Sequence, residues 1–272
     1  MAIDYVIDLA CAPKAALSTE GILQRLKGRA RAEAIIQLFR DEGDNRPVSE
    51  IGFEFTRTAA DGSEETGVAM VQHLLDDAEA LDPLAHHCVG CPANGGGSGG
   101  SGTDGEPYGC FGFIQYPLSV RAEAWLINRL PGPEEPLVWL LLRQGIDQLG
   151  YDGKSVEPLR EDNTYFEERR VLGRDFVEFK VTSNQVFEML FLLGHVQPSH
   201  AGVLLLFFNA ISRDIEAQQI MQVMNAPEEI DPKPPFLLQA ETGDDQTIGE
   251  LKAFFKALYM AWTLKRPLLL DV

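Results

Sequence analysis

Three of the four cysteines of this chain lie in one stretch, residues 86–116, and their spacing is typical of a metal site. Two residues separate Cys88 from Cys91, so a tight turn can point both thiolates at one ion. Gly90 lies inside this turn and permits the backbone dihedral angles that the turn requires. Pro92 then directs the chain away. The pair therefore supplies half of a tetrahedral ligand set.

The other half of the ligand set has to come from Cys110 and Cys11, the two remaining cysteines. Glycines lie near Cys110 and a proline lies two positions after Cys11, which favours turns at both places. Four cysteines in turns, with none left over, predict a closed four-cysteine zinc site formed by Cys11, Cys88, Cys91 and Cys110. We expect this zinc to be structural because four thiolates leave no coordination position for substrate or water.

Histidines next to the cysteine pair offer a different fourth ligand. His86 and His87 directly precede Cys88, and either could replace Cys11. Ligands that are close neighbours in the chain strain their coordination of one ion, however. A supporting or surface role is therefore the more common one for such a histidine.

Two other chemistries could use the same cysteines. An iron–sulfur cluster suits thiolate ligands, and Cys91-Pro92 resembles the cysteine–proline pair that ends some ferredoxin motifs, although the compact run of three cysteines is missing. A dithiol redox role for Cys88 and Cys91 would place the pair at the start of a helix after a strand. Here Pro92 and a glycine tract lead into a loop instead.

The glycine tract at residues 95–102 reads GGGSGGSG and stands apart in composition. Such a segment can neither bury surface nor hold one conformation, and it resembles the flexible spacers of engineered proteins. If it replaces a longer natural loop, the spacing between Cys91 and Cys110 carries no information about the motif. The zinc prediction therefore does not use that spacing.

Known catalytic motifs are mostly missing from the sequence. It contains no His-Glu-x-x-His, and no His-x-Glu that would complete a zinc deaminase with the cysteine pair. Glu188, His195 and His200 could line a cleft, but histidines at helix ends more often act as caps. The sequence thus leaves open whether the chain is an enzyme.

The charge and length of the chain narrow the classes of partner. It has 272 residues and a net charge of −18, which repels nucleic acid and anionic membranes and favours protein, cation or small-molecule partners. We interpret the basic cluster Arg25, Lys27, Arg29 and Arg31 as a solvated helix face. The longest apolar run, residues 201–211, is well short of the ~20 residues that span a bilayer.

The N-terminal residues provide the sequence information about cellular location. It has no basic region, and Asp4 and Asp8 interrupt its apolar run, so we do not expect a secretory signal. This predicts a cytoplasmic protein, where paired thiols more often bind metal than form disulfides.

Periodicity of the apolar residues predicts a mixed fold. Strands are expected at residues 3–9, 48–58, 111–116 and 170–181, and a helix at 19–42 capped by Ser18 or Thr19. Further helices are expected at residues 66–80, 119–130, 136–149, 184–193, 199–211 and 212–224, and from Thr247 onward. The fold class is therefore α+β, a small and mostly antiparallel sheet covered by several helices, with a metal-binding loop that uses the four cysteines.

The polar segment at residues 150–163 is the best candidate for a boundary. It would divide residues 1–150, an α+β metal-binding half, from residues 151–272, a mainly helical half packed on it, unless both form one continuous domain. The expected function is a regulatory or assembly protein that is not catalytic and binds a protein partner through its helical half or its acidic loop at 225–246. The alternative is an iron–sulfur or thiol–disulfide oxidoreductase that uses the same cysteines.

Overall fold

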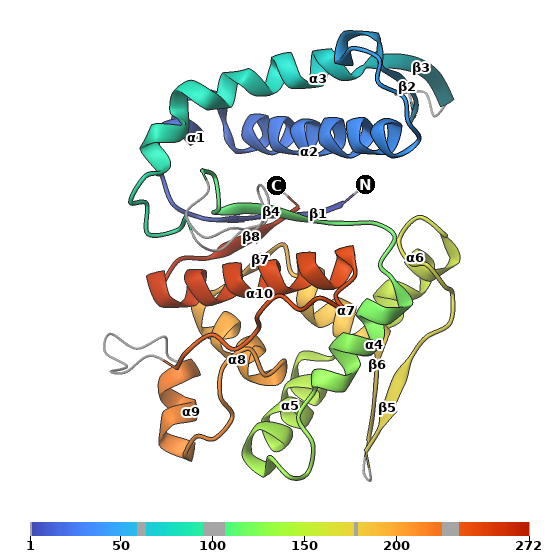
Figure 1. The fold of residues 1–272 in the computed structure, drawn as a ribbon. Coiled ribbons are helices and arrows are strands. Elements are labelled where there is room, and N and C mark those ends of the chain that lie inside the picture. The colour runs from blue at the N-terminus through green and yellow to red at the C-terminus, as the bar shows by residue number, and fades with distance from the viewer. Residues whose placement is uncertain (1, 59–63, 95–106, 177–178, 225–233, 272) are drawn as a thin grey trace. The chain divides into compact units, whose positions relative to one another are not determined.

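The structure is a computed structural model that combines helices with a small antiparallel sheet, as the sequence predicts (Figure 1). It describes residues 2–58, 64–94, 107–176, 179–224 and 234–271. The glycine tract at 95–102 and residues 225–233 of the acidic loop lie outside the described residues. Within the described residues, no helix combines the length and the apolar composition that crossing a bilayer requires.

The chain forms two compact units, which are described separately below. One unit is Ala10–Cys91, and the other consists of Met1–Leu9 together with Pro92–Val272. The first unit is thus an insertion in the sequence of the second. These bounds do not coincide with the boundary expected near residue 150, because elements on both sides of it pack together: α5 (Pro136–Leu149) contacts α8 (Pro198–Phe207).

A four-stranded antiparallel sheet is the centre of the larger unit. Its order is β4-β1-β8-β7, formed by β4 (Phe111–Gln115), β1 (Ala2–Ile7), β8 (Leu268–Leu270) and β7 (His195–Val196). The strand β1 pairs with β4 from Ala2↔Gln115 to Val6↔Phe111, and with β8 from Tyr5↔Leu270 to Ile7↔Leu268. The two ends of the chain therefore share one sheet.

Helices of the larger unit cover one face of this sheet (Figure 1). The long helix α10 (Gln246–Leu264) packs against β4, β1 and β8, and α8 packs against α10 (Figure 1). The N-cap of α10 is Asp245, which accepts a hydrogen bond from the backbone N–H of Ile248, so the helix begins one residue before the predicted start at Thr247. The remaining elements are α4 (Val120–Arg129), η3 (Lys154–Val156), α6 (Glu157–Glu161), β5 (Gly173–Asp175), β6 (Lys180–Thr182), α7 (Ser183–Phe191) and α9 (Ala217–Met224).

Tyr5 shows why the sheet needs a glycine at one position. Its side chain is fully buried and meets the ring of Phe254 on α10 edge to face, with 5.3 Å between the ring centroids. Gly112 is its partner on β4, and a Cβ atom there would lie 2.3 Å from the Tyr5 ring. The tyrosine ring therefore occupies the space above a residue that has no side chain.

The smaller unit contains α1 (Ala12–Leu17), α2 (Thr19–Asp41), η1 (Val48–Glu50), β2 (Gly52–Thr58), β3 (Glu64–Met70), α3 (Val71–Ala78) and η2 (Glu79–Cys88). Ser18 caps α2 by accepting a hydrogen bond from Gly21, as predicted. The helix expected at residues 66–80 instead begins as a strand. Residues up to Met70 belong to β3, which pairs with β2 from Thr58↔Glu64 to Gly52↔Met70. This pairing overrides the helical pattern of the sequence.

Arginines of α2 find carboxylate partners inside the smaller unit. Arg25 pairs with Asp77 at 3.1 Å, and Arg29 pairs with Asp82 at 2.8 Å. Arg31 lies over the ring of Phe53, 4.4 Å from its centroid. The acidic partners agree with the expected charge balance, but Arg25 and Arg29 are only 23% and 35% exposed, so this face is less solvated than predicted.

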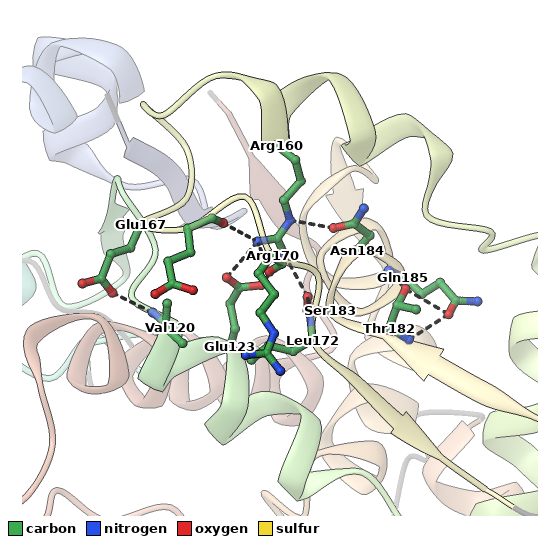
Figure 2. Close-up of polar contacts among 11 residues, drawn as sticks. Val120, Glu123, Arg160, Glu167, Arg170, Leu172, Thr182, Ser183, Asn184 and Gln185 are labelled. Carbon is green, nitrogen blue, oxygen red and sulfur yellow. Dashed lines mark hydrogen bonds and ion pairs between the residues drawn. The ribbon is translucent and has the colours of Figure 1, made fainter.

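A buried ion pair joins three helices of the larger unit (Figure 2). The side chains of Arg160 on α6 and Glu123 on α4 are each 3% exposed. The guanidinium group donates to both carboxylate oxygens of Glu123, to Oδ1 of Asn184 at 2.7 Å and to Oγ of Ser183 at 2.9 Å. It also donates to the carbonyl oxygen of Glu168 and lies 3.7 Å from the centroid of Phe166. These contacts offset the desolvation of the pair.

Removing one partner of this pair should destabilise the protein strongly. We expect Glu123→Ala to lower the free energy of unfolding by about 3–5 kcal/mol, because it leaves the Arg160 charge buried without its carboxylate. Glu161→Ala is the matched control, since that carboxylate is 77% exposed in its pair with Arg169 and should contribute little. Urea unfolding measures both. Equal losses in the two variants would contradict this account.

Candidate metal centre

Cys88 and Cys91 lie at the two ends of a type II β-turn. The backbone N–H of Cys91 donates to the carbonyl oxygen of Cys88 at 3.1 Å. Between them, Val89 has φ −65° and ψ 121°, and Gly90 has φ +73°. These angles are those of a type II turn, which needs glycine at its third position and brings its end Cα atoms within about 7 Å. Cys88 and Cys91 therefore lie on the tight turn that their spacing predicts.

The turn follows η2, whose last residue is Cys88. Cys88 is buried and Cys91 is half-buried, whereas Val89 is 83% exposed. The turn therefore exposes its two central residues, Val89 and Gly90, to solvent and keeps its first thiol inside. Both histidines before it are exposed. The Nδ1 atom of His86 lies 2.8 Å from the carbonyl oxygen of Pro83, and the rings of His86 and His87 are 3.9 Å apart.

Cys11 belongs to the same unit as this turn. It is the N-cap residue of α1 and is half-buried in an extended conformation, with φ −153° and ψ 164°. The helix α1 packs against η2. The element that begins after Cys11 therefore contacts the element that ends at Cys88.

Cys110 belongs to the larger unit and lies directly before β4. It is 7% exposed and lies in a tight turn in which the N–H of Phe111 donates to the carbonyl oxygen of Tyr108 at 2.9 Å. The carbonyl oxygen of Cys110 accepts a hydrogen bond from the N–H of Ile7 at 3.0 Å. This contact places Cys110 beside the end of β1, where the chain leaves the larger unit.

The predicted ligands are thus divided between the units, three in Ala10–Cys91 and one in the other. In the conformation described for residues 2–58, 64–94, 107–176, 179–224 and 234–271, no three His, Cys, Asp or Glu side chains form a group that could hold a metal ion. The tight turn suits two positions of a tetrahedral site. The complete set of four cysteine ligands stays a prediction from the sequence.

The positions of Glu188, His195 and His200 are explained without a shared cleft. The carboxylate of Glu188 accepts hydrogen bonds from the N–H of Gly153 and the hydroxyl of Ser155. His195 is exposed on β7, and His200 is half-buried in the first turn of α8. Burial lowers the pKa of His200 from its ordinary value. Glu188 thus fastens the loop before η3 to α7.

Two features of the structure were not predicted. Asn94 accepts a hydrogen bond from Gly109, next to Cys110, and Arg160 pairs with Glu123. A signal for Asn94 existed, because asparagine after Pro92 is a common turn residue that bonds nearby backbone. The 37 residues between Arg160 and Glu123 gave no comparable local signal.

Comparison of the chain with models of known protein families, with curated proteins and with solved structures found no match.

The turn geometry predicts a specific role for Gly90. Gly90→Ala and Gly43→Ala both force a side chain into positive φ, +73° and +82°, in places where a Cβ atom would meet nothing within 4 Å. Each should therefore cost about 1–2 kcal/mol of stability. Only Gly90→Ala should also weaken zinc binding, because only it disturbs the cysteine turn. Chelator competition measures the zinc affinity, and equal affinities in the two variants would argue against a metal role for this turn.

The lowered pKa of His200 predicts a dependence of stability on pH. The folded state disfavours the charged imidazole, so the unfolded state binds a proton at higher pH than the folded state does. Stability should fall as the pH drops below about 6.5, and His200→Gln should reduce that fall. His195→Gln, an exposed control on β7, should not. Urea unfolding on both sides of that pH tests this, and an identical fall in all three proteins would refute it.

Proposed function

We propose that this chain is a regulatory or assembly protein, not an enzyme, that binds one structural zinc ion through Cys11, Cys88, Cys91 and Cys110. It acts in the cytoplasm, where thiols stay reduced, and binds a protein partner. The observation that carries the proposal is the position of the cysteines along the chain. Cys11, Cys88 and Cys91 lie at the two connections where the chain passes from one compact unit to the other, after Leu9 and before Pro92. Cys110 accepts a backbone hydrogen bond from Ile7, just before the first connection.

Chain geometry supports this ligand set. Cys11 follows Ile7 by four residues, and the N–H of Ile7 donates a hydrogen bond to the carbonyl oxygen of Cys110. An extended chain gains at most ~3.6 Å per residue, so the Cα atoms of Ile7 and Cys11 are no more than about 14 Å apart. Where the chain re-enters the larger unit, Cys91 precedes Asn94 by three residues, and Asn94 accepts a hydrogen bond from Gly109. Both connections are thus short tethers to the turn that carries Cys110.

Metal binding on this proposal includes a rearrangement. The thiols have to converge, because no group of three possible ligands stands ready among the described residues. A bound zinc ion supplies a cross-link between distant parts of the backbone, and its binding free energy then adds to folding stability. The thiolates fill its coordination sphere, which is why the role is structural.

The net charge of the chain indicates what kind of surface its protein partner presents. A net charge of −18 favours association with a protein that presents a basic surface, through electrostatic attraction during encounter. Salt should weaken such binding by screening. Nucleic acid and anionic membranes carry the same sign as this chain and are disfavoured.

A second function uses the same cysteines, as an iron–sulfur or thiol–disulfide oxidoreductase. The observation that favours it is the turn itself, because Cα atoms at the ends of a type II turn lie within the range that a disulfide can bridge. Cys91 is half-buried, which leaves its thiol partly accessible. Visible absorbance after anaerobic purification would indicate iron.

Substitution of the cysteines tests the zinc proposal. We expect Cys88→Ser and Cys91→Ser to lower the zinc content from about one per chain and to lower the melting temperature, since serine is a poor zinc ligand. Cys11→Ser and Cys110→Ser should do the same. Elemental analysis and thermal unfolding of the full chain provide the measurements.

Val89→Ser is the matched control, because it changes an exposed side chain of the same turn and removes no thiol. It should keep its zinc. Unchanged zinc content and stability in both Cys88→Ser and Cys91→Ser would reject the site. Loss of zinc only in variants of His86 or His87 would show that a histidine, and not the predicted set of four cysteines, binds the ion.

A further inference from the structure

Helix α5 carries apolar side chains on two opposite sides. Val138, Leu142 and Ile146 recur every four residues and are buried, so they form the side that packs on the core of the larger unit. Leu137 and Leu140 lie on the other side, and they are 42% and 51% exposed. Exposed leucines scattered singly over a surface need no explanation, but neighbours on one helix face form a patch. This side of α5 is therefore more apolar than contact with water requires.

The exposed side continues along the helix as a stripe without charge. Leu141 in this stripe is half-buried, and its two glutamines are exposed. We call the set the α5 stripe; its residues follow the spacing i, i+3, i+4, i+7 and i+11 on one face and are Leu137, Leu140, Leu141, Gln144 and Gln148. At ~1.5 Å per residue the stripe is about 17 Å long. Apolar residues at this spacing are typical of a face by which one helix contacts another.

Aromatic rings extend the apolar surface on one flank of α5. Trp139 is half-buried, and its ring centroid lies 5.6 Å from that of Phe179. Phe179 stacks on Phe176 with 4.8 Å between the centroids, and both are half-buried. Phe176 follows β5 in the chain, and Phe179 precedes β6. Partly exposed aromatic side chains next to leucines are typical of the centre of a protein interface.

Carboxylates lie at both ends of the α5 stripe. Glu134 is exposed just before the helix, and Asp147 is exposed in its last turn. Arg143, the one basic residue of α5, lies between them in the sequence and is half-buried. The last carbonyl groups of a helix also carry partial negative charge. Both ends of the stripe therefore favour cationic groups, in a chain whose net charge is −18.

We propose that the α5 stripe binds the protein partner, and that the partner contributes an amphipathic helix. The apolar side of that helix packs on Leu137, Leu140 and Leu141. A Lys or Arg near each of its ends pairs with Glu134 or Asp147. Burial of the leucines supplies affinity, and the charges fix the register along the stripe. A second copy of this chain fits less well, because its own stripe is also flanked by carboxylates. This inference rests on the protein partner of the proposed function and is independent of the zinc ligands.

A synthetic peptide with this chemistry is the probe. It has about 18 residues, since shorter isolated helices are marginal in water, with leucines along one side, lysines at each end, and alanine and glutamine elsewhere. A second peptide has the same composition and the same lysines, but its leucines are distributed over all sides. Fluorescence anisotropy of the labelled peptides with the full chain measures both affinities. The amphipathic peptide should bind at least about tenfold more tightly, and added salt should weaken its binding.

Variants of the full chain locate the binding surface. Leu137→Gln combined with Leu140→Gln should weaken binding of the amphipathic peptide about 10- to 100-fold, because two apolar contacts are lost. Leu192→Gln is the matched control, since that leucine is also 42% exposed but lies at the end of α7, and it should bind as the wild type does. Asp147→Lys should weaken binding about 3- to 10-fold. Glu161→Lys, on α6, changes the net charge equally and should have little effect.

Three results would overturn this inference. In the first, the two peptides bind equally, or the leucine variant binds as the wild type does. In the second, light scattering shows a wild-type dimer that the leucine variant dissociates, so a second copy occupies the stripe. In the third, the leucine variant lowers the melting temperature of the free chain and Leu192→Gln does not, so the chain itself covers the stripe.

Elemental analysis of the same preparations separates this inference from the proposed zinc site. A chain that contains zinc but does not bind the amphipathic peptide contradicts the α5 stripe alone. A chain that binds the peptide in the predicted way but contains no zinc contradicts the zinc site alone.

Discussion

The first strand of the chain, β1, pairs with a strand that begins only at Phe111, and the rest of the structure depends on this pairing. Between the two strands the chain builds the whole unit Ala10–Cys91 and returns. Closing so long a loop costs conformational entropy. Burial of Tyr5 against Phe254 and pairing with β8 on the other edge of β1 help to offset that cost. The strand pairing also sets Cys110 beside Ile7, where the chain departs.

The architecture contains one cross-link between distant residues, and our proposal adds a second one of a different kind. In the larger unit, Arg160 and Glu123 tie α6 to α4 through a pair whose hydrogen bonds are satisfied by neighbours such as Asn184. That link is complete within the folded chain. Cys11, Cys88 and Cys91 lie in the sequence next to the points where the chain passes between units, and on our proposal they need an ion to be linked to Cys110. The first fixes the shape of one unit, and the second would make the stability of the chain depend on metal.

The sequence predicted elements whose signals are local. The helix Pro136–Leu149 has the predicted bounds, and α4, capped by Ser119, lies within the helix predicted at residues 119–130. Proline and serine act at helix starts through nearby backbone. Predictions failed where distant residues decide. Pairing with β2 turned the start of the expected helix at 66–80 into β3. No linker composition marks the passages at Leu9 and Cys91, so the unit bounds could not be read from composition. For the candidate site, Gly90 indicated the Cys88 turn, while the hydrogen bond from Gly109 to Asn94 joins residues that are 15 positions apart.

The central claim is that four cysteine sulfurs bind a single zinc ion. X-ray absorption at the zinc edge of the metal-loaded full chain tests it most directly, since it reports the type, number and distance of the atoms bound to the metal. Our account predicts four sulfur neighbours at about 2.3 Å and no nitrogen or oxygen in the coordination shell. A shell with two sulfurs or fewer, or one completed by water, would contradict it.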